Sequence, residues 1–234
     1  IRWTIGGSLT TLSNKVKSLG QLNEMVSTLD DNAQLITRTN ENPYSFYGLR
    51  ALGVFSTTAE AEAANLTANG QKFAAGDVHY ADLNNDGVID GSDCDIIGSA
   101  TPDIYGSIFT RVEYKQFALD MTFAYSVGND AYNAVRRITE SSSDFANQAQ
   151  SVNRRWSMEG QQTDMPRARW NDRIGNNAFS DRWIEDASYL KLRDITLSYT
   201  WQKPLWNFLQ GGTAFITGQN LLTFADFKGN DPEA

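Results

Sequence analysis

The sequence predicts an all-β chain, a segment of a large antiparallel transmembrane β-barrel with long extracellular loops, and two observations support this fold class. Apolar residues alternate with small or polar ones over stretches of about ten residues, which is typical of strands in an outer-membrane barrel. The connections between these stretches are alternately long and short, so in an up-and-down sheet all the long ones lie at the same end. The 234 residues contain no run of about 20 apolar residues, so we expect no membrane-spanning helix.

Five strands follow from the alternation. Between residues 117 and 125 every odd position is apolar, and every even position is small or polar. The range 188–201 has the same pattern over most of its length, with Lys191 and Arg193 on the apolar face near one end. The predicted strands span 1–10, 104–113, 117–127, 188–201 and 213–223.

The two long connections, 11–103 and 128–187, are expected to be extracellular loops with some helical structure. Thr57–Ala68 is rich in alanine and glutamate and reads as a short helix, and a second helix is expected to begin at Ser143 or Asp144. Five strands of about ten residues cannot close even a barrel of eight. The chain is therefore expected to be a slice of a longer protein, with both of its ends cut.

The sharpest local motif is an acidic loop at residues 82–93. Oxygen-bearing side chains stand at positions 1, 3, 5, 9 and 12 of its twelve residues, position 6 is glycine, and position 7 offers a backbone carbonyl. This is the spacing of an EF-hand-type calcium loop, in which about six to eight oxygens surround a hard cation. The predicted metal ligands are Asp82, Asn84, Asp86, the carbonyl of Val88, Asp90 and Asp93.

Two features of the acidic loop bear on its role. Position 12 is Asp93 in place of the longer glutamate of a regulatory EF-hand, which favours a structural calcium ion over a sensor site. Residues 76–80 read as extended chain, so the helix that precedes the loop in a true EF-hand is not expected. The alternative is an Asx-rich turn that its own side chains stabilise without a metal.

Motifs in a fixed order extend along nearly the whole chain. They comprise Asn14-Lys15-Val16, Phe46-Tyr47-Gly48, the stretch from Gly76 to Pro102 with the acidic loop, Gly128-Asn129 with Tyr132-Asn133, Arg155 to Arg167, Arg182 to Tyr199, and Gly218 to Glu233. Taken together, these segments resemble the SusC/RagA-type TonB-dependent outer-membrane receptors of Bacteroidetes. The resemblance covers the C-terminal portion of that family, and no residue matches its plug domain or TonB box.

The resemblance implies a role for the complete protein. Family members have an N-terminal plug and a 22-stranded barrel, and they import nutrients, usually glycans or peptides. The implied partners are a SusD-like surface lipoprotein, TonB acting through the absent plug region, the glycan or peptide substrate, and outer-membrane lipid. The implied location is the outer membrane of a Gram-negative cell, with the long loops outside. The sequence assigns no substrate-binding residues.

Composition and isolated reactive residues argue against other function classes. A formal net charge of −8 is opposite to what binding to phosphates requires, so no nucleic-acid partner is expected. His79 lacks a partnered base, and Cys94 reads as a small buried side chain. Glu185 and Asp186 read as solvated or salt-bridged surface residues, so we expect no catalytic site and no enzyme. The remaining alternative is a soluble, calcium-stabilised β-sandwich domain that binds carbohydrate.

The tryptophans allow two interpretations in each part of the chain. Trp201 and Trp206 flank a short turn, where an aromatic girdle would meet the membrane interface, although a sandwich core gives the same alternation. Trp156, Trp170 and Trp183 lie in the long loops, where they either pack the loops or stack on sugar rings. We expect a girdle for the first pair and loop packing for the other three.

Overall fold

The computed structural model describes residues 1–29, 31–202, 211–229 and 231–232. The chain divides into two compact units. The sheet unit comprises Ile1–Ser13, Thr101–Asn129 and Asp186–Ala234, and the loop unit comprises Asn14–Ala100 and Asp130–Glu185. No helix in the described part of the chain is long and apolar enough to cross a membrane.

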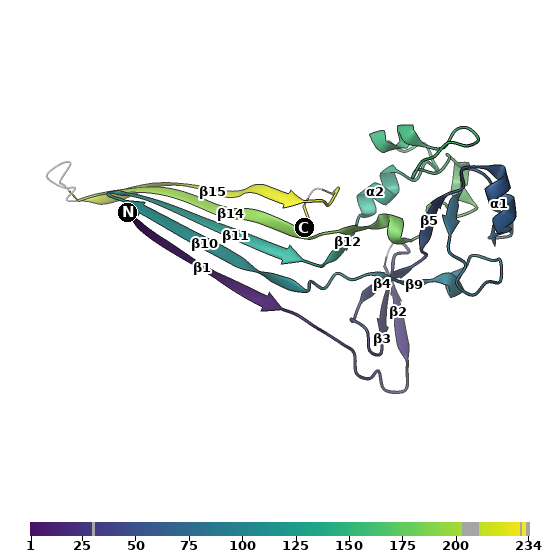
Figure 1. The fold of residues 1–234 in the computed structure, drawn as a ribbon, viewed down its shortest axis with the longest axis horizontal. Coiled ribbons are helices and arrows are strands. Elements are labelled where there is room, and N and C mark those ends of the chain that lie inside the picture. Colours follow the sequence, from purple (N-terminus) through teal and green to yellow (C-terminus); the bar gives the residue numbers. More distant parts are fainter. Residues whose placement is uncertain (30, 203–210, 230, 233–234) are drawn as a thin grey trace. The chain divides into compact units, whose positions relative to one another are not determined.

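The sheet unit is one antiparallel sheet of five strands in the order β1-β10-β11-β14-β15 (Figure 1). Its strands are β1 (Arg2–Thr11), β10 (Ile104–Tyr114), β11 (Phe117–Val127), β14 (Tyr189–Trp201) and β15 (Gly212–Ala225). Within this unit the spatial order follows the chain, which gives an up-and-down meander with open edges at β1 and β15. The strands occupy the five predicted ranges, and every end lies within two residues of its predicted position.

The register gives the sheet two chemically different faces. One row across all five strands is apolar and consists of Trp3, Val112, Leu119, Leu197 and Ile216. Successive residues of a strand point to opposite faces, so the next row lies on the other side of the sheet. That row is polar and consists of Thr4, Arg111, Asp120, Thr196 and Thr217. An ion pair of 2.8 Å joins Arg111 Nη1 to Asp120 Oδ1 on this face.

A β-bulge in β14 corrects one expectation about these faces. Thr122 pairs with Asp194 whereas Phe123 pairs with Leu192, so Arg193 is an extra residue relative to β11. The extra residue reverses the alternation along the rest of the strand. Lys191 was expected on the apolar face, but it pairs with Ala124 and lies on the polar side. It is 4% exposed, and its Nζ lies 2.9 Å from Asp231 Oδ2.

The loop unit contains several short strands in segments whose sequence predicts loop. A four-stranded sheet has the order β2 (Glu24–Thr28), β3 (Gln34–Arg38), β4 (Ser45–Gly48) and β9 (Asp95–Gly98). The two-stranded sheets are β5 (Ala51–Val54) with β8 (Val78–Tyr80), β6 (Thr67–Ala68) with β7 (Gln71–Lys72), and β12 (Asp130–Tyr132) with β13 (Ile184–Asp186). Strands of two to five residues are too short to establish a period in the sequence.

Helices in the loop unit are few and short. Helix α1 (Thr58–Ala64) lies inside the predicted range, and the hydroxyl of Thr57 caps it by accepting from the N–H of Glu60 at 3.2 Å. Helix α2 (Ala134–Thr139) was not predicted. The second predicted helix is represented only by the 3₁₀ turn Gln150–Arg154, which begins later than expected.

An apolar core holds the loop unit together. Its central residues are Phe55, Phe73, Val78, Tyr80 and Ile174, none more than 5% exposed. The ring centroid of Phe73 lies 6.3 Å from the ring centroid of Phe55 and 6.3 Å from that of Tyr80. Ile174 belongs to the second long connection and the other four to the first, so the two connections share one core.

Candidate functional site

The acidic loop folds as a series of Asx turns. Asp82 accepts hydrogen bonds from the N–H of Asp86 at 3.2 Å and of Gly87 at 2.8 Å. Asp86 in turn accepts from the N–H of Val88 at 2.7 Å, and Asn84 Oδ1 accepts from the N–H of Asp86 at 3.0 Å. Gly87 has a φ of +79°, which explains why glycine stands at the sharpest point of the turn.

Asp93 closes the acidic loop from its other end. Its side chain is fully buried and accepts from the N–H of Leu83 and of Asp90, both at 2.9 Å. Among the described residues, no group of three or more His, Cys, Asp or Glu side chains is arranged to hold a metal ion. The predicted ligands thus lie in one ordered loop whose carboxylates bind backbone N–H groups, and calcium binding stays a prediction.

Cys94 follows this loop and is half-buried rather than fully buried. Burial, with the charges of Asp93 and Asp90, raises the pKa of its thiol to about 11. The thiol lines a recess of about 230 Å³ together with Tyr47 and Phe179. A thiol with so high a pKa is a poor nucleophile at neutral pH.

A buried carboxylate forms the polar centre of the loop unit. Asp77 is 0% exposed. Arg167 donates hydrogen bonds to both of its oxygens, from Nε at 2.9 Å and from Nη2 at 3.0 Å. Arg169 also contacts both oxygens, through Nε at 3.0 Å and Nη2 at 3.1 Å. Asn176 Nδ2 and the N–H of Ala74 each donate to the same carboxylate at 3.0 Å. A buried charge with this many donors holds together two segments of chain about ninety residues apart.

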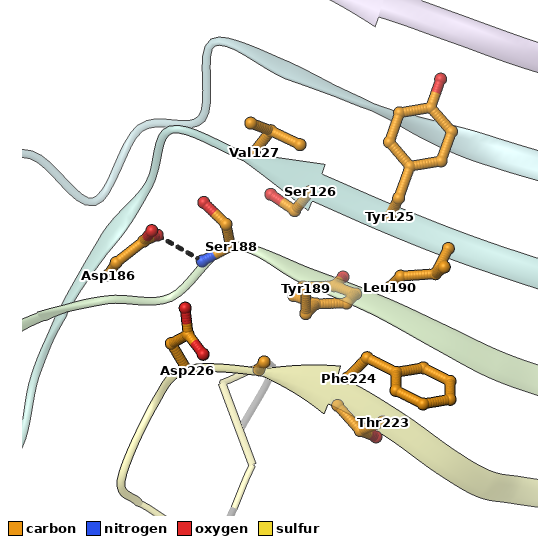
Figure 2. Close-up of a pocket in the computed structure, with 11 residues that line it drawn as sticks. Tyr125, Ser126, Val127, Asp186, Ser188, Tyr189, Leu190, Thr223, Phe224 and Asp226 are labelled. Carbon is orange, nitrogen blue, oxygen red and sulfur yellow. Dashed lines mark hydrogen bonds between the residues drawn. The ribbon is translucent and has the colours of Figure 1, made fainter.

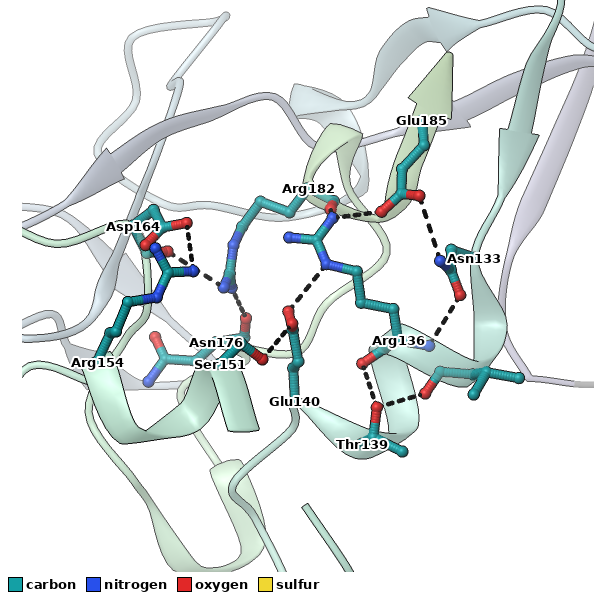
Figure 3. Close-up of polar contacts among 11 residues, drawn as sticks. Asn133, Arg136, Thr139, Glu140, Ser151, Arg154, Asp164, Asn176, Arg182 and Glu185 are labelled. Carbon is teal, nitrogen blue, oxygen red and sulfur yellow. Dashed lines mark hydrogen bonds and ion pairs between the residues drawn. The ribbon is translucent and has the colours of Figure 1, made fainter. Parts of the chain in front are cut away.

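A second polar network is centred on Arg136 (Figure 3). It lies against Trp183, which is 1% exposed. Arg136 pairs with Glu140 at 3.0 Å and with Glu185 at 2.8 Å. The guanidinium groups of Arg182 and Arg136 lie 4.8 and 5.7 Å from the Trp183 ring centroid. Burial lowers the pKa of Arg182. Glu185 was expected to be a solvated or salt-bridged surface residue. It does form a salt bridge, to Arg136, but its side chain is only 9% exposed.

The lone histidine has a structural contact. The His79 ring stacks on Phe55 with a centroid distance of 4.3 Å and an interplanar angle of 23°. Burial lowers the pKa of His79, against a smaller opposing effect of the Glu60 charge.

The lowered pKa of His79 leads us to expect that the stability of the loop unit depends on pH. A lowered pKa means that the unfolded chain binds the proton more readily, so stability falls as the pH drops from about 6.5 through the folded-state pKa. Between about pH 7.5 and about pH 5.5 the melting temperature of the loop unit should fall less in His79→Gln than in the wild type. Tryptophan fluorescence of the full receptor in detergent would measure both, and identical pH profiles would contradict the assignment.

An open recess lies at one end of strands β11, β14 and β15 (Figure 2). Its lining combines the rings of Tyr125 and Phe224 with the carboxylates of Asp186 and Asp226. Hydrogen bonds from the hydroxyl and N–H of Ser188 hold the pKa of Asp186 below its usual range. No local motif marks this recess, because its residues come together only through the pairing of the three strands.

The aromatic residues separate into exposed and packed groups. Trp201 lies on the apolar face of the sheet with Tyr199, their centroids 6.4 Å apart, at the end with the short connections. Trp206 lies outside the described residues. In the loop unit Trp183 is buried, whereas Trp170 is 67% exposed and its ring lies 4.6 Å from that of Phe145.

No family model matches the chain. TonB-dependent receptor P3 of Formosa agariphila is 32% identical over 201 residues, which cover 85% of this chain and 19% of the relative. TonB-dependent receptor P26 of the same organism is 28% identical over 239 residues, covering 99% of this chain and 23% of the relative. TonB-dependent receptor SusC of Bacteroides thetaiotaomicron is 27% identical over 161 residues, covering 66% and 15%.

Solved structures give the same picture of the fold. The match to the structure of the RagAB peptide transporter covers 99% of this chain and 25% of that chain, with a TM-score of 0.74 and 24% identity. The match to the RagAB peptide importer in the open-open state covers 99% of this chain and 24% of that chain, with a TM-score of 0.72 and 23% identity. The chain therefore spans about a fifth to a quarter of the length of these relatives.

Proposed function

Because the chain belongs to the SusC/RagA-type TonB-dependent receptors of Bacteroidetes, we propose that it forms part of the wall and outer loops of an outer-membrane nutrient transporter. The observation that carries the proposal is the two-faced sheet. On its apolar face Ile5, Leu9 and Ile216 are between 63% and 71% exposed. Side chains of this kind suit lipid tails, whereas the polar face suits a water-filled interior.

The finer features of the transporter are part of the same proposal. A complete barrel of 22 strands would continue from the open edges at β1 and β15. The cargo is a glycan or a peptide, and a SusD-like surface lipoprotein is the partner. TonB would act through a plug domain outside residues 1–234. Deleting the gene should abolish uptake of one such nutrient, and the complete gene should restore it.

A solubility test separates the transporter from the alternative domain. Residues 1–234 alone should not unfold cooperatively as a monomer in detergent-free buffer, because the apolar face of the sheet would stand in water. A cooperative monomer in that buffer would instead support a soluble, calcium-stabilised β-domain that binds carbohydrate.

Labelling of introduced cysteines tests the orientation. Glu62 is exposed on α1, and Gln116 is exposed in the short turn between β10 and β11. A membrane-impermeant maleimide added to intact cells should label Glu62→Cys and leave Gln116→Cys unlabelled. The high pKa of Cys94, about 11, keeps the background low. Equal labelling of both variants in intact cells would contradict loops that face the outside.

A structural calcium ion in the acidic loop is a second proposal. Its support is the donor set of Asp82, Asn84, Asp86, Val88, Asp90 and Asp93, with a sharp turn at Gly87. A hard cation there would offset the repulsion among the four aspartates.

Metal removal tests this proposal. At calcium concentrations about a hundred times the dissociation constant, the ion should stabilise the loop unit by about 2.7 kcal/mol. Chelation by EDTA should therefore lower its melting temperature. The Asp86→Asn variant keeps an oxygen for the Asx turn while losing the charge, so it should respond less to EDTA. An unchanged melting midpoint in the wild type would contradict a bound ion.

A further inference from the structure

The outer edge of β2 is unpaired in the described part of the chain. In the four-stranded sheet the order is β2-β3-β4-β9, so β2 has a neighbour on one side only (Figure 1). All five of its residues, Glu24–Thr28, are exposed. An edge of this kind offers a row of backbone donors and acceptors to another strand.

The register shows which backbone groups face outward. Hydrogen bonds close the β2–β3 ladder at both ends, from the N–H of Leu29 to Ala33 at 2.8 Å and from the N–H of Thr39 to Asn23 at 3.2 Å. Bonded and non-bonded residues alternate in an antiparallel pair. The odd-numbered residues of β2 are therefore the ones that bond to β3.

The even-numbered residues of β2 are Glu24, Val26 and Thr28. Their N–H and C=O groups point away from β3, toward the open edge. They supply up to three donors and three acceptors in one line, which is the arrangement that an extended segment needs to add a strand.

Side chains along β2 leave the edge without protection. Natural edge strands carry lysine, proline or a bulge that discourages pairing. β2 contains no lysine or proline, and its register with β3 runs without a bulge from Glu24 to Thr28. The one charge on the strand, Glu24, is paired with Arg38 at 3.0 Å. Met25 is 52% and Val26 47% exposed, so the strand is apolar at its centre.

We propose that this edge receives an extended strand from the receptor's own polypeptide, supplied by a segment outside residues 1–234. This inference rests on the proposed function, which makes the chain a slice of a longer receptor. The relatives P3 and P26 are four to five times as long as the region they share with this chain, since it covers 19% and 23% of them. The incoming segment carries an apolar residue against Val26 and no proline opposite the outward groups.

Covalent attachment favours this source over a separate molecule. A segment of the same chain is present at high effective concentration and covers the edge at all times. A dissociable partner or cargo would expose the apolar edge strand whenever it left, which is the condition that natural sheets avoid.

Hydrogen exchange in the full-length receptor tests the pairing. The amides of Met25 and Ser27 bond to β3 and serve as the protected reference. If a strand is added, the amides of Val26 and Thr28 should exchange at least about tenfold more slowly than in an unstructured peptide. The same measurement is made in detergent without cargo and without any partner protein.

A proline variant gives the second readout. Val26→Pro removes an outward N–H and no bond to β3, so the Thr28 amide should lose its protection while Met25 and Ser27 keep theirs. Val26→Thr, which keeps the N–H, is the matched control and should retain protection at Thr28.

Each outcome decides the proposal. Fast exchange at Val26 and Thr28 in a folded receptor overturns it, and so does protection that appears only after cargo or a partner protein is added. Heat-modifiable migration of the receptor in electrophoresis reports barrel formation separately. A chain that forms no barrel contradicts the proposed function and this inference with it, whereas a folded barrel with an unprotected edge overturns this inference alone.

Discussion

Replacing Asp77 with alanine should lower the free energy of unfolding of the loop unit by about 3–5 kcal/mol, the usual result of removing one partner from a buried ion pair. Arg167 would lose both of its contacts, at 2.9 and 3.0 Å, and Arg169 would lose its two contacts, at 3.0 and 3.1 Å. The N–H of Ala74 and the amide of Asn176 would also lose their acceptor. Tryptophan fluorescence during thermal unfolding of the detergent-solubilised receptor would measure the loss.

A surface aspartate provides the control for Asp77. Asp95 pairs with Arg50 at 3.8 Å, and its side chain is 46% exposed. Because solvent screens such a pair, Asp95→Ala should cost less than about 1 kcal/mol. Asp77→Asn keeps one acceptor oxygen and should fall between the two alanine variants. Equal effects of Asp77→Ala and Asp95→Ala would show that the buried carboxylate does not organise the loop unit.

Trp183→Ala should destabilise the loop unit by a similar amount, about 3–5 kcal/mol, because it opens a cavity in a packed site. The side chain is almost wholly buried, and its indole N–H donates to the carbonyl of Ala178 at 3.0 Å. The substitution also removes the ring over which Arg182 and Arg136 lie. Protease sensitivity of segments 14–100 and 130–185 would report the change.

Trp170 is the matched control for Trp183. It lies in the same long connection but is 67% exposed, and its nearest aromatic neighbour, Phe145, is 93% exposed. Trp170→Ala should change stability by no more than about 0.5 kcal/mol, as is usual for surface substitutions. A Trp170 variant as unstable as the Trp183 variant would contradict the assignment of Trp183 to the core.

The five strands of the sheet unit could be predicted because their alternation of apolar and polar residues is long and lies within one stretch of sequence. A period of two that lasts ten residues or more, as in β11, leaves little room for another structure. The bulge at Arg193 could not be predicted, because a single extra residue leaves no mark on composition or spacing. Its consequence, the turn of Lys191 to the polar side, was missed for the same reason.

The loop unit was harder to predict because its order comes from distant contacts. Trp170 and Trp183 look alike in the sequence, yet only the second meets the arginines that enclose it. Asp77 also carries no local signal, since Arg167 and Arg169 lie far along the chain. In the acidic loop, the turn at Gly87 follows from the sequence, whereas the grouping of its carboxylates depends on rotamers that spacing does not determine.

The shared core of the loop unit limits how these loops can be exchanged. Residues 14–100 supply Asp77 and Phe55, residues 130–185 supply Arg167 and Ile174, and the β10–β11 hairpin lies between the two stretches in the chain. A chimaera that takes one stretch from a relative would pack half of this core against a foreign counterpart. It would also leave a buried carboxylate without its arginine partners. The two stretches therefore form a single module for recombination, and an exchange of loops with a relative has to move both together.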